Sequence, residues 1–396
     1  MLEVEKIFRQ RFHCPPTHTL RVPGSVELLG SYASVTRGLA LGAGLDKGLE
    51  VSLAPRSDGR VCLALTGREQ PVIFWITDLS LKESPEWVKP IKSVLSALRK
   101  RGMSFSGFNA AFHSTLPLHG HSGIQALVPL GALLGMRQLQ PFRLTDTGFL
   151  RPPQRDHRGR LPALTGKEKL CFAKLCRDAC LETGSDQDLL PYVTPLFSKP
   201  FSVVLLDHLH ETVTQHPMPG TSALVICQIP HRAGDEPMRA ELKRAECRDA
   251  AKALALKVLR SADLHYIRVN QNRLNDTLFR CAYHIAGEVK RVMAAESALQ
   301  IFDLEQFGHS LFQSHESSRD FFGITSPEIE LIYDTARTFG ACSGARLVGT
   351  GFEGTVVSLV FLYAVPEFTR ALSSKYFDKT GRDLNLVVSQ ISGGVL

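Results

Sequence analysis

The alternation of apolar and polar positions divides the chain into strands and helices in mixed order. Short apolar segments with a period of two, separated by Gly, Pro, Asp and Ser, predict antiparallel strands, and apolar positions that recur every three or four residues predict helices. The predicted strands are 49–53, 61–65, 72–75, 107–113, 202–206, 223–227, 345–348 and 355–363, and the predicted helices are 90–100, 124 onward, 167–181, 238–260, 278–297, 304–315 and 327–340. This order is typical of an α+β protein.

Two details of the pattern make local predictions. In the helix 278–297, Ile285, Val289 and Val292 form one apolar stripe, which we expect to be buried. Pro129 falls about five residues into the helix that starts near 124, so we expect it to kink or end that helix. The segment 141–166 is rich in Pro, Arg and Gly without a period, which is typical of a long surface loop.

Composition limits the class of protein. A chain of 396 residues with 44% hydrophobic and 21% charged residues is long enough for two globular domains, which we place at 1–195, including the basic loop 141–166, and at 196–396. The longest apolar stretches are well short of the roughly 20 residues of a membrane helix, and the acidic N-terminus is unlike a secretory signal. We therefore expect a cytoplasmic protein with no membrane contact.

Charge and cysteine content argue against a nucleic-acid partner and against a metal site formed by cysteines. The net charge of +7 is concentrated partly in the basic loop, and no long basic run interleaved with aromatic residues is present, so we expect no nucleic-acid partner. The nine cysteines include no Cys-x-x-Cys pair, which favours reduced, buried thiols over a metal site.

Residues 22–30, Val-Pro-Gly-Ser-Val-Glu-Leu-Leu-Gly, carry the first sign of a family. The segment resembles the galactokinase signature Pro-Gly-Arg-Val-Asn-Leu-Ile-Gly-Glu-His-Thr-Asp-Tyr, although the polar residues that follow Gly30 are replaced here by Ser-Tyr-Ala-Ser-Val at 31–35. Further segments resemble galactokinase motifs in the same order along the chain: 205–212 with 223–227, 243–247, 314–320 and 344–354. The resemblance therefore extends over nearly the whole chain.

The resemblance implies the two-domain α+β fold of the GHMP kinases, which include galactokinase, homoserine, mevalonate and phosphomevalonate kinases, with ATP and substrate in a cleft between the domains. In the family an aspartate accepts the sugar hydroxyl proton, an arginine steers that aspartate, and a serine and a glutamate hold Mg²⁺ on ATP. The cofactors implied are ATP and Mg²⁺ if the protein is active, and none otherwise.

Matched to the family's motifs, the catalytic groups are only partly present. Asp186 stands at the position of the base, but Ser25 replaces the arginine whose charge would lower the carboxylate's pKa and orient it. The glutamate that holds Mg²⁺ in the family has no clear match in this sequence, and Asp178 is the acid nearest to its expected position. The family's phosphate loop keeps glycines and a possible helix cap, whereas its serine triplet has become Gly-Ile-Gln, and neither of the last two side chains is a good Mg²⁺ ligand. The candidate phosphate-binding residues are Gly120, Ser122, Gly123, Gly349, Gly351 and Gly354.

The sugar pocket departs furthest from the family. Its expected residues are Ser25, Ser31, Tyr32, Ser34 and Gly184. The Glu, His and Asp that bind galactose hydroxyls in the family have no counterpart among them, and the loss of fixed polar partners costs orders of magnitude in discrimination. We therefore expect no tight galactose recognition.

Three hypotheses about function remain open from the sequence. The first is a galactokinase-like protein, a pseudokinase that has lost most or all sugar phosphorylation and acts as a ligand-binding or regulatory relative. The second is an active ATP-dependent kinase for another sugar or small alcohol, with Asp186 as base. The third is a scaffold that binds a protein partner and no nucleotide. The C-terminal glycine turn is compatible with a phosphate-facing loop and with a plain hairpin.

Overall fold

The computed structural model describes residues 1–116, 126–145, 148–150, 152–181, 188–229 and 236–394. Its contacts divide the chain into two compact units that are not contiguous in sequence. Unit 1 comprises Met1–Gly24, Lys47–Phe197 and Gly394–Leu396, and unit 2 comprises Ser25–Asp46 and Ser198–Gly393. Helices and strands are mixed in both units, so the predicted α+β class is confirmed. The division into domains 1–195 and 196–396 stays a prediction.

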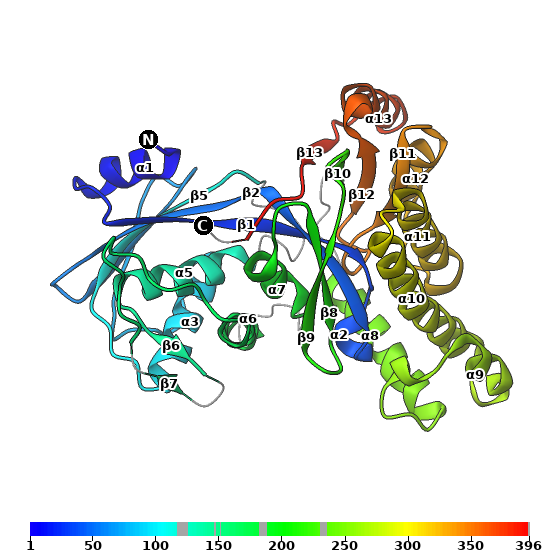
Figure 1. The fold of residues 1–396 in the computed structure, drawn as a ribbon, viewed down its shortest axis with the longest axis horizontal. Helices are drawn as coiled ribbons and strands as arrows, with labels where there is room; N and C mark the ends of the chain where they lie inside the picture. Colours follow the sequence, from blue (N-terminus) through cyan, green and yellow to red (C-terminus); the bar gives the residue numbers. More distant parts are fainter. Residues whose placement is uncertain (117–125, 146–147, 151, 182–187, 230–235, 395–396) are drawn as a thin grey trace. The chain divides into compact units, whose positions relative to one another are not determined.

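Unit 1 is built on a sheet with helices on both faces (Figure 1). Its strands follow the order β4 (Val72–Trp75), β3 (Arg60–Leu65), β5 (Phe108–Ser114) and the second half of β2 (Leu39–Pro55), which is flanked by β1 (His18–Leu29). β3 and β5 pair in parallel, whereas β3 pairs with β4, and β2 with β5, in antiparallel orientation. Helix α1 (Glu3–Phe12) covers one face, where it buries Val4 and Phe8.

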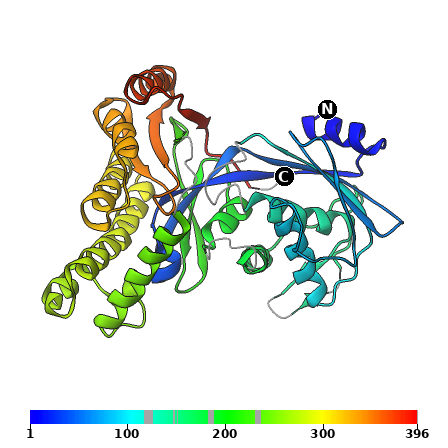
Figure 2. The same ribbon diagram turned by 180° about the vertical axis from the view of Figure 1, so that it is seen from behind.

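The opposite face of this sheet carries the remaining helices of unit 1 (Figure 2). They are α3 (Lys89–Lys100), α5 (Leu127–Leu139), α6 (Gly166–Leu181) and α7 (Leu190–Phe197). α5 approaches the sheet so closely that a Cβ at Gly131 would lie 2.9 Å from Val51 Cγ2. The sequence prediction for α3 is confirmed, since its apolar positions are buried.

Three local predictions in the described chain are wrong in detail. Pro129 neither kinks nor ends its helix, because it is the third residue of α5, where no backbone N–H has a partner within the helix. The helix expected over 238–260 ends earlier, as α8 (Glu236–Ala253), and Ala255 then adopts a φ of 56°. The loop 141–166 contains the short pair β6 (Arg143–Leu144) and β7 (Phe149–Leu150).

Unit 2 contains a four-stranded antiparallel sheet covered by helices. Its strand order is β11 (Cys342–Leu347), β12 (Thr355–Phe361), β10 (Ser222–Gln228) and β13 (Asn385–Ser389). The first half of β2 pairs with β8 (Ser202–Asp207), which pairs with β9 (Thr212–Pro217). The larger helices are α8, α10 (Asp276–Gln300), α11 (Leu304–Ser317), α12 (Pro327–Thr338) and α13 (Val365–Thr380), with the shorter α2 (Ala33–Thr36) and α9 (Leu264–Val269).

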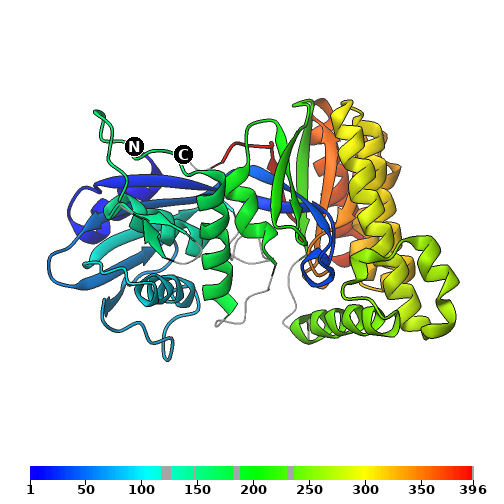
Figure 3. The ribbon, with the colours of Figure 1, turned by 60° about the horizontal axis from the view of Figure 1, so that its bottom comes forward.

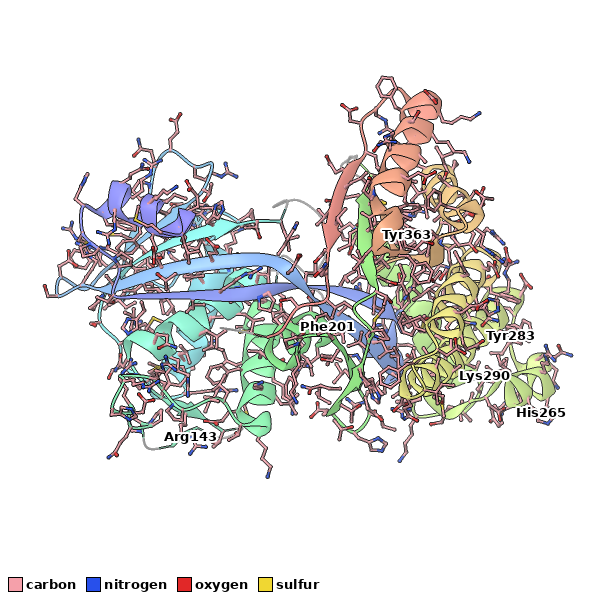
Figure 4. The ribbon with its side chains drawn as sticks, turned by 45° about the horizontal axis from the view of Figure 1, so that its top comes forward. Arg143, Phe201, His265, Tyr283, Lys290 and Tyr363 are labelled. Carbon is pink, nitrogen blue, oxygen red and sulfur yellow. The ribbon has the colours of Figure 1, made fainter. Side chains whose placement is uncertain are left out.

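Helix α10 is the longest of the described helices, and it runs alongside α11 (Figure 3). Ile285 and Val292 of its predicted stripe are fully buried and Val289 is half-buried, which confirms the orientation that the sequence predicted. The exposed Lys290 lies on the side of this helix away from the sheet (Figure 4). None of the helices in the described ranges is long and apolar enough to cross a membrane.

Candidate functional site

Several predicted site residues lie outside the described part of the chain. They are Gly120, Ser122, Gly123, Gly184 and Asp186. Their assignments as phosphate loop, pocket residue and base stay predictions. The other predicted residues fall in three places: the end of β1 and the turn that follows it, the C-terminal glycine turn, and helix α6.

The end of β1 leads into a tight turn at Gly30, which has a φ of 97°. A Cβ at this position would lie 2.3 Å from the carbonyl oxygen of Leu39, so the turn requires glycine. Ser31 is 1% exposed and Ser25 is 6% exposed, whereas Ser34 is half-buried. Most of the polar side chains expected to form a sugar pocket are therefore buried within unit 2.

Arg346 on β11 forms hydrogen bonds with the end of β1 and with this turn. Its guanidinium is fully buried, and Nη1 donates to Glu27 Oε1 at 3.2 Å and to the carbonyl oxygen of Leu28 at 3.1 Å. Nη2 donates to Ser31 Oγ, and the Ser31 hydroxyl donates to Glu27 Oε1 at 3.2 Å. Both hydrogen-bonding roles of the Ser31 hydroxyl are thus used inside unit 2.

A second carboxylate, Glu288 on α10, completes a buried ionic cluster. Its Oε1 accepts from Arg291 Nε at 2.6 Å, and its Oε2 accepts from the backbone N–H of Gly30 at 3.1 Å. Burial acts to raise the pKa of Glu288, but the positive charges of Arg291 and Arg346 act in the opposite direction and outweigh it. The pKa of Glu288 is therefore well below its ordinary value. The pKa of Glu27 is raised by burial; Arg346 opposes the rise and Glu288 adds to it.

His284, one turn before Glu288, is a neutral member of the same region. Its ring is fully buried, its Nδ1 lies 2.9 Å from Ser317 Oγ, and it stacks on Phe322 with ring centroids 4.5 Å apart. Burial lowers the pKa of His284 to about 3, because no solvent stabilises an imidazolium there. The ring therefore packs as an uncharged aromatic group at neutral pH.

Tyr32 connects the turn after β1 to the C-terminal glycine turn. It adopts a φ of 59°, its ring packs edge-on against Phe322, and its hydroxyl donates to the carbonyl oxygen of Thr350 at 3.0 Å. The structure thus brings together two segments that the family resemblance singled out at opposite ends of the chain. Tyr32 is 8% exposed and its hydroxyl is already bonded.

All three predicted glycines of the C-terminal glycine turn adopt the left-handed backbone conformation that favours glycine. Gly349, Gly351 and Gly354 have φ values of 65°, 82° and 66°. A Cβ at Gly351 would lie 2.8 Å from the carbonyl oxygen of Ile324, and one at Gly349 would lie 2.9 Å from Glu353 Oε2. The Glu353 carboxylate therefore lies beside the turn. Its assignment as a phosphate-facing loop stays a prediction.

Asp178, the weak candidate for a metal ligand, is an exposed residue of α6. Its Oδ1 accepts from Arg177 Nε at 2.8 Å, and it lines a small cavity together with Lys100 and Arg101. Within the described ranges, no three or more His, Cys, Asp or Glu residues come together to hold a metal ion. Asp178 as a metal ligand stays a prediction.

The segment 314–320 contributes a structural histidine. His315 is fully buried, its Nδ1 accepts from the backbone N–H of Leu347 at 3.1 Å, and the tautomer that this requires donates from Nε2 to Glu330 Oε1 at 3.2 Å. The ring stacks on Tyr333 with centroids 3.8 Å apart. His315 thereby joins α11 to β11 and α12.

Sequence reasoning missed Glu27, His284, Glu288 and Arg291. Two of these were marked in the pattern: Glu27 interrupts an apolar strand end, and Glu288 lies three residues after Ile285 on the apolar stripe. An acid on a buried face needs a positive partner, so both positions pointed to an ion pair. Nothing in the sequence pattern identified Arg346 as the partner of Glu27.

Comparison with known proteins identifies the fold. The family model described as GHMP kinases C terminal matches residues 295–378. The chain is 27% identical over 399 residues to a galactokinase of Roseiflexus sp. (strain RS-1), covering 99% of this chain and 96% of the relative. It is also 27% identical over 399 residues to a galactokinase of Chloroflexus aurantiacus, covering 98% and 95%.

A solved structure agrees. The galactokinase of Lactococcus lactis, crystallised with galactose, superimposes with a TM-score of 0.84 at 20% identity, covering 99% of this chain and 98% of that one. The expected GHMP-kinase fold is confirmed. The chain is therefore similar over nearly its whole length to galactokinases, and its fold is that of the GHMP kinases.

Proposed function

We propose that this protein is a galactokinase relative in which ATP-dependent sugar phosphorylation is lost or much reduced, and that it acts by binding a sugar-like ligand or by regulation. One observation carries the proposal. Ser31 and Tyr32 stand where the family's signature has Glu and His, and both hydroxyls are engaged in hydrogen bonds within unit 2. Neither hydroxyl can donate a hydrogen bond to a sugar without breaking an internal bond.

The chemistry of the substituted positions supports this proposal. The family's signature has asparagine at position 27 and glutamate at position 31, and this chain has Glu27 and Ser31. The carboxylate near Arg346 is thus supplied by position 27, where it neutralises a buried cation. A carboxylate held in that ion pair does not simply replace one that binds substrate, because its Oε1 already accepts from the guanidinium and from Ser31.

The expected base, Asp186, also lacks the assisting arginine that the family has. Ser25, at the position of the steering arginine, is 6% exposed and brings no positive charge. An aspartate without a nearby cation keeps a pKa closer to its ordinary value and is less strictly oriented. Phosphoryl transfer depends on geometry and charge neutralisation, so we expect Asp186 alone to support slow turnover at most. The galactokinase relatives imply ATP and Mg²⁺ as the cofactors of any activity that remains.

A coupled ADP-release assay with ATP, Mg²⁺ and D-galactose tests the proposal, with Asp186→Ala as the matched control and the Lactococcus lactis galactokinase as the positive standard. We expect turnover about a hundredfold to a thousandfold below the standard, since removal of one preorganised hydrogen-bond donor typically costs 10²–10³ in kcat. Turnover within tenfold of the standard, abolished by Asp186→Ala, would refute the loss of activity.

An active kinase with another substrate is the second candidate, and one feature favours it. The three turn glycines have positive φ values and no side chain, and a backbone without side chains can approach a ligand closely. The same assay, run over a panel of sugars and small alcohols, distinguishes the two functions. If any compound of the panel is turned over, and this turnover depends on Asp186, the second function is assigned.

A further inference from the structure

Helices α3 and α6 of unit 1 enclose a cavity of about 140 Å³ that none of the proposed functions uses. Ser93, Ala97, Lys100 and Arg101 line it from α3 and the residue after it, and Leu175, Asp178 and Ala179 line it from α6. Of the lining residues, Ser93 and Leu175 are buried, at 3% and 1% exposed, whereas Lys100 and Asp178 are exposed. A water's share of liquid volume is about 30 Å³, so a tetrahedral oxyanion with its waters fits in this space.

Two polar groups in the lining have no hydrogen-bond partner among the described residues. They are the Ser93 hydroxyl and Arg101 Nη1, and both atoms are buried. A buried donor without a partner costs about 1–3 kcal/mol, and native structures contain few of them. Two such donors on one cavity indicate that the cavity normally holds an acceptor.

The end of α3 does not require Arg101 as a cap. The backbone N–H of Arg101 and that of Met103 both donate to the carbonyl oxygen of Leu98, and that of Gly102 donates to the carbonyl oxygen of Arg99. The neighbouring Arg99 side chain is engaged with the carbonyl oxygens of 76 and 77. The guanidinium of Arg101 is therefore not needed to satisfy the carbonyl groups at this helix end.

The charge of the lining favours an anion. Lys100 and Arg101 are positive, and the only carboxylate in the lining, Asp178, is paired with Arg177. A divalent cation at this place would meet two positive side chains, whereas an oxyanion would accept from them. Guanidinium groups present several donors in a fork that matches phosphate oxygens, and serine adds a hydroxyl donor.

We propose that this cavity binds a phosphate group, as inorganic phosphate or as the phosphate of a monoester, through Ser93 and Arg101, while Lys100 adds positive charge to the lining. The site uses none of the residues on which the proposed function rests, so either proposal can fail without the other. It lies on one unit, and all of its residues are within the described ranges.

Titration calorimetry of the full chain at constant ionic strength tests the site, with inorganic phosphate in one arm and glucose 1-phosphate in the other. We expect Arg101→Gln to weaken binding about tenfold or more, because it removes a charge-assisted hydrogen bond. Arg68→Gln is the matched control, since Arg68 is an exposed arginine of the same unit, and we expect it to leave affinity unchanged.

Ser93→Ala provides a second test that does not depend on charge. Removing a buried hydroxyl that has no partner leaves stability unchanged or raises it, so we expect a folded protein with weaker phosphate binding. Binding in only one arm assigns the source of the phosphate group. No binding in either arm, or equal affinities in the wild type, Arg101→Gln and Ser93→Ala, would overturn the proposal.

Discussion

Arg346 and Glu27 form a buried ion pair, with Nη1 and Oε1 3.2 Å apart, that joins β11 to the end of β1. The two residues are 319 positions apart in the chain. Their pairing holds the turn that contains the substituted signature against the sheet of unit 2. The polar groups of this region thereby contribute to the fold.

Removal of the carboxylate partner should be costly. We expect Glu27→Gln to lower the free energy of unfolding by about 3 kcal/mol, because an uncompensated charge is left in a buried site. Urea unfolding at pH 7 measures the change. Glu241→Gln, which removes an acid from an exposed ion pair on α8, should cost about 1 kcal/mol or less. Equal effects of the two substitutions would contradict a buried ion pair at Glu27.

The position of the carboxylate can be tested by exchanging it. We expect Ser31→Glu alone to destabilise the protein, because it adds an acid beside Glu27 and Glu288. Glu27→Asn combined with Ser31→Glu restores the family's pattern and should recover part of that loss. A double-mutant cycle by urea unfolding should give a coupling of about 1–3 kcal/mol. A coupling near zero would mean that the two positions do not share Arg346.

The buried imidazole of His284 predicts a pH dependence. Its pKa is about 3 in the folded protein and near 6.5 when unfolded, so below pH 6.5 the unfolded state binds more protons and stability falls as pH falls. Between pH 6.5 and 5.5 this residue should remove about 1 kcal/mol.

We expect His284→Gln to flatten the pH dependence over that interval, which lies above the usual titration range of carboxylic acids. Thermal or urea unfolding of both proteins at matched ionic strength measures it. His265→Gln on α9 is a control for which no such flattening is expected, since His265 is exposed. An unchanged slope in His284→Gln would show that the ring is not held neutral.

The glycine turn should tolerate no side chain at Gly351. We expect Gly351→Ala to cost more than 2 kcal/mol, because a positive φ disfavours alanine and its Cβ would lie 2.8 Å from a backbone oxygen. Gly102→Ala separates the two effects, since Gly102 has a φ of 92° with nothing within 4 Å of a Cβ, and it should cost about 1 kcal/mol. Thermal unfolding compares the two, and equal costs would contradict the steric part.

Much of the fold could be predicted from the sequence, because its elements are local. The apolar periods located α3, α10 and α12 with small errors at their ends, since burial of one helix face requires a repeat of three to four residues. The same reasoning failed at Pro129, where the cost of a proline depends on its distance from the helix start.

The resemblance to galactokinases, and the positions at which this chain departs from their motifs, could be found from the sequence alone, because motifs are read from residues that are adjacent in the chain. Only the tertiary structure decided what the substituted residues do. Ser31 and Tyr32 could have faced a ligand or the interior, and their partners, Arg346 and the carbonyl of Thr350, are more than 300 residues away. A hydrogen bond depends on distance and direction in space, and neither is contained in the order of residues along a chain.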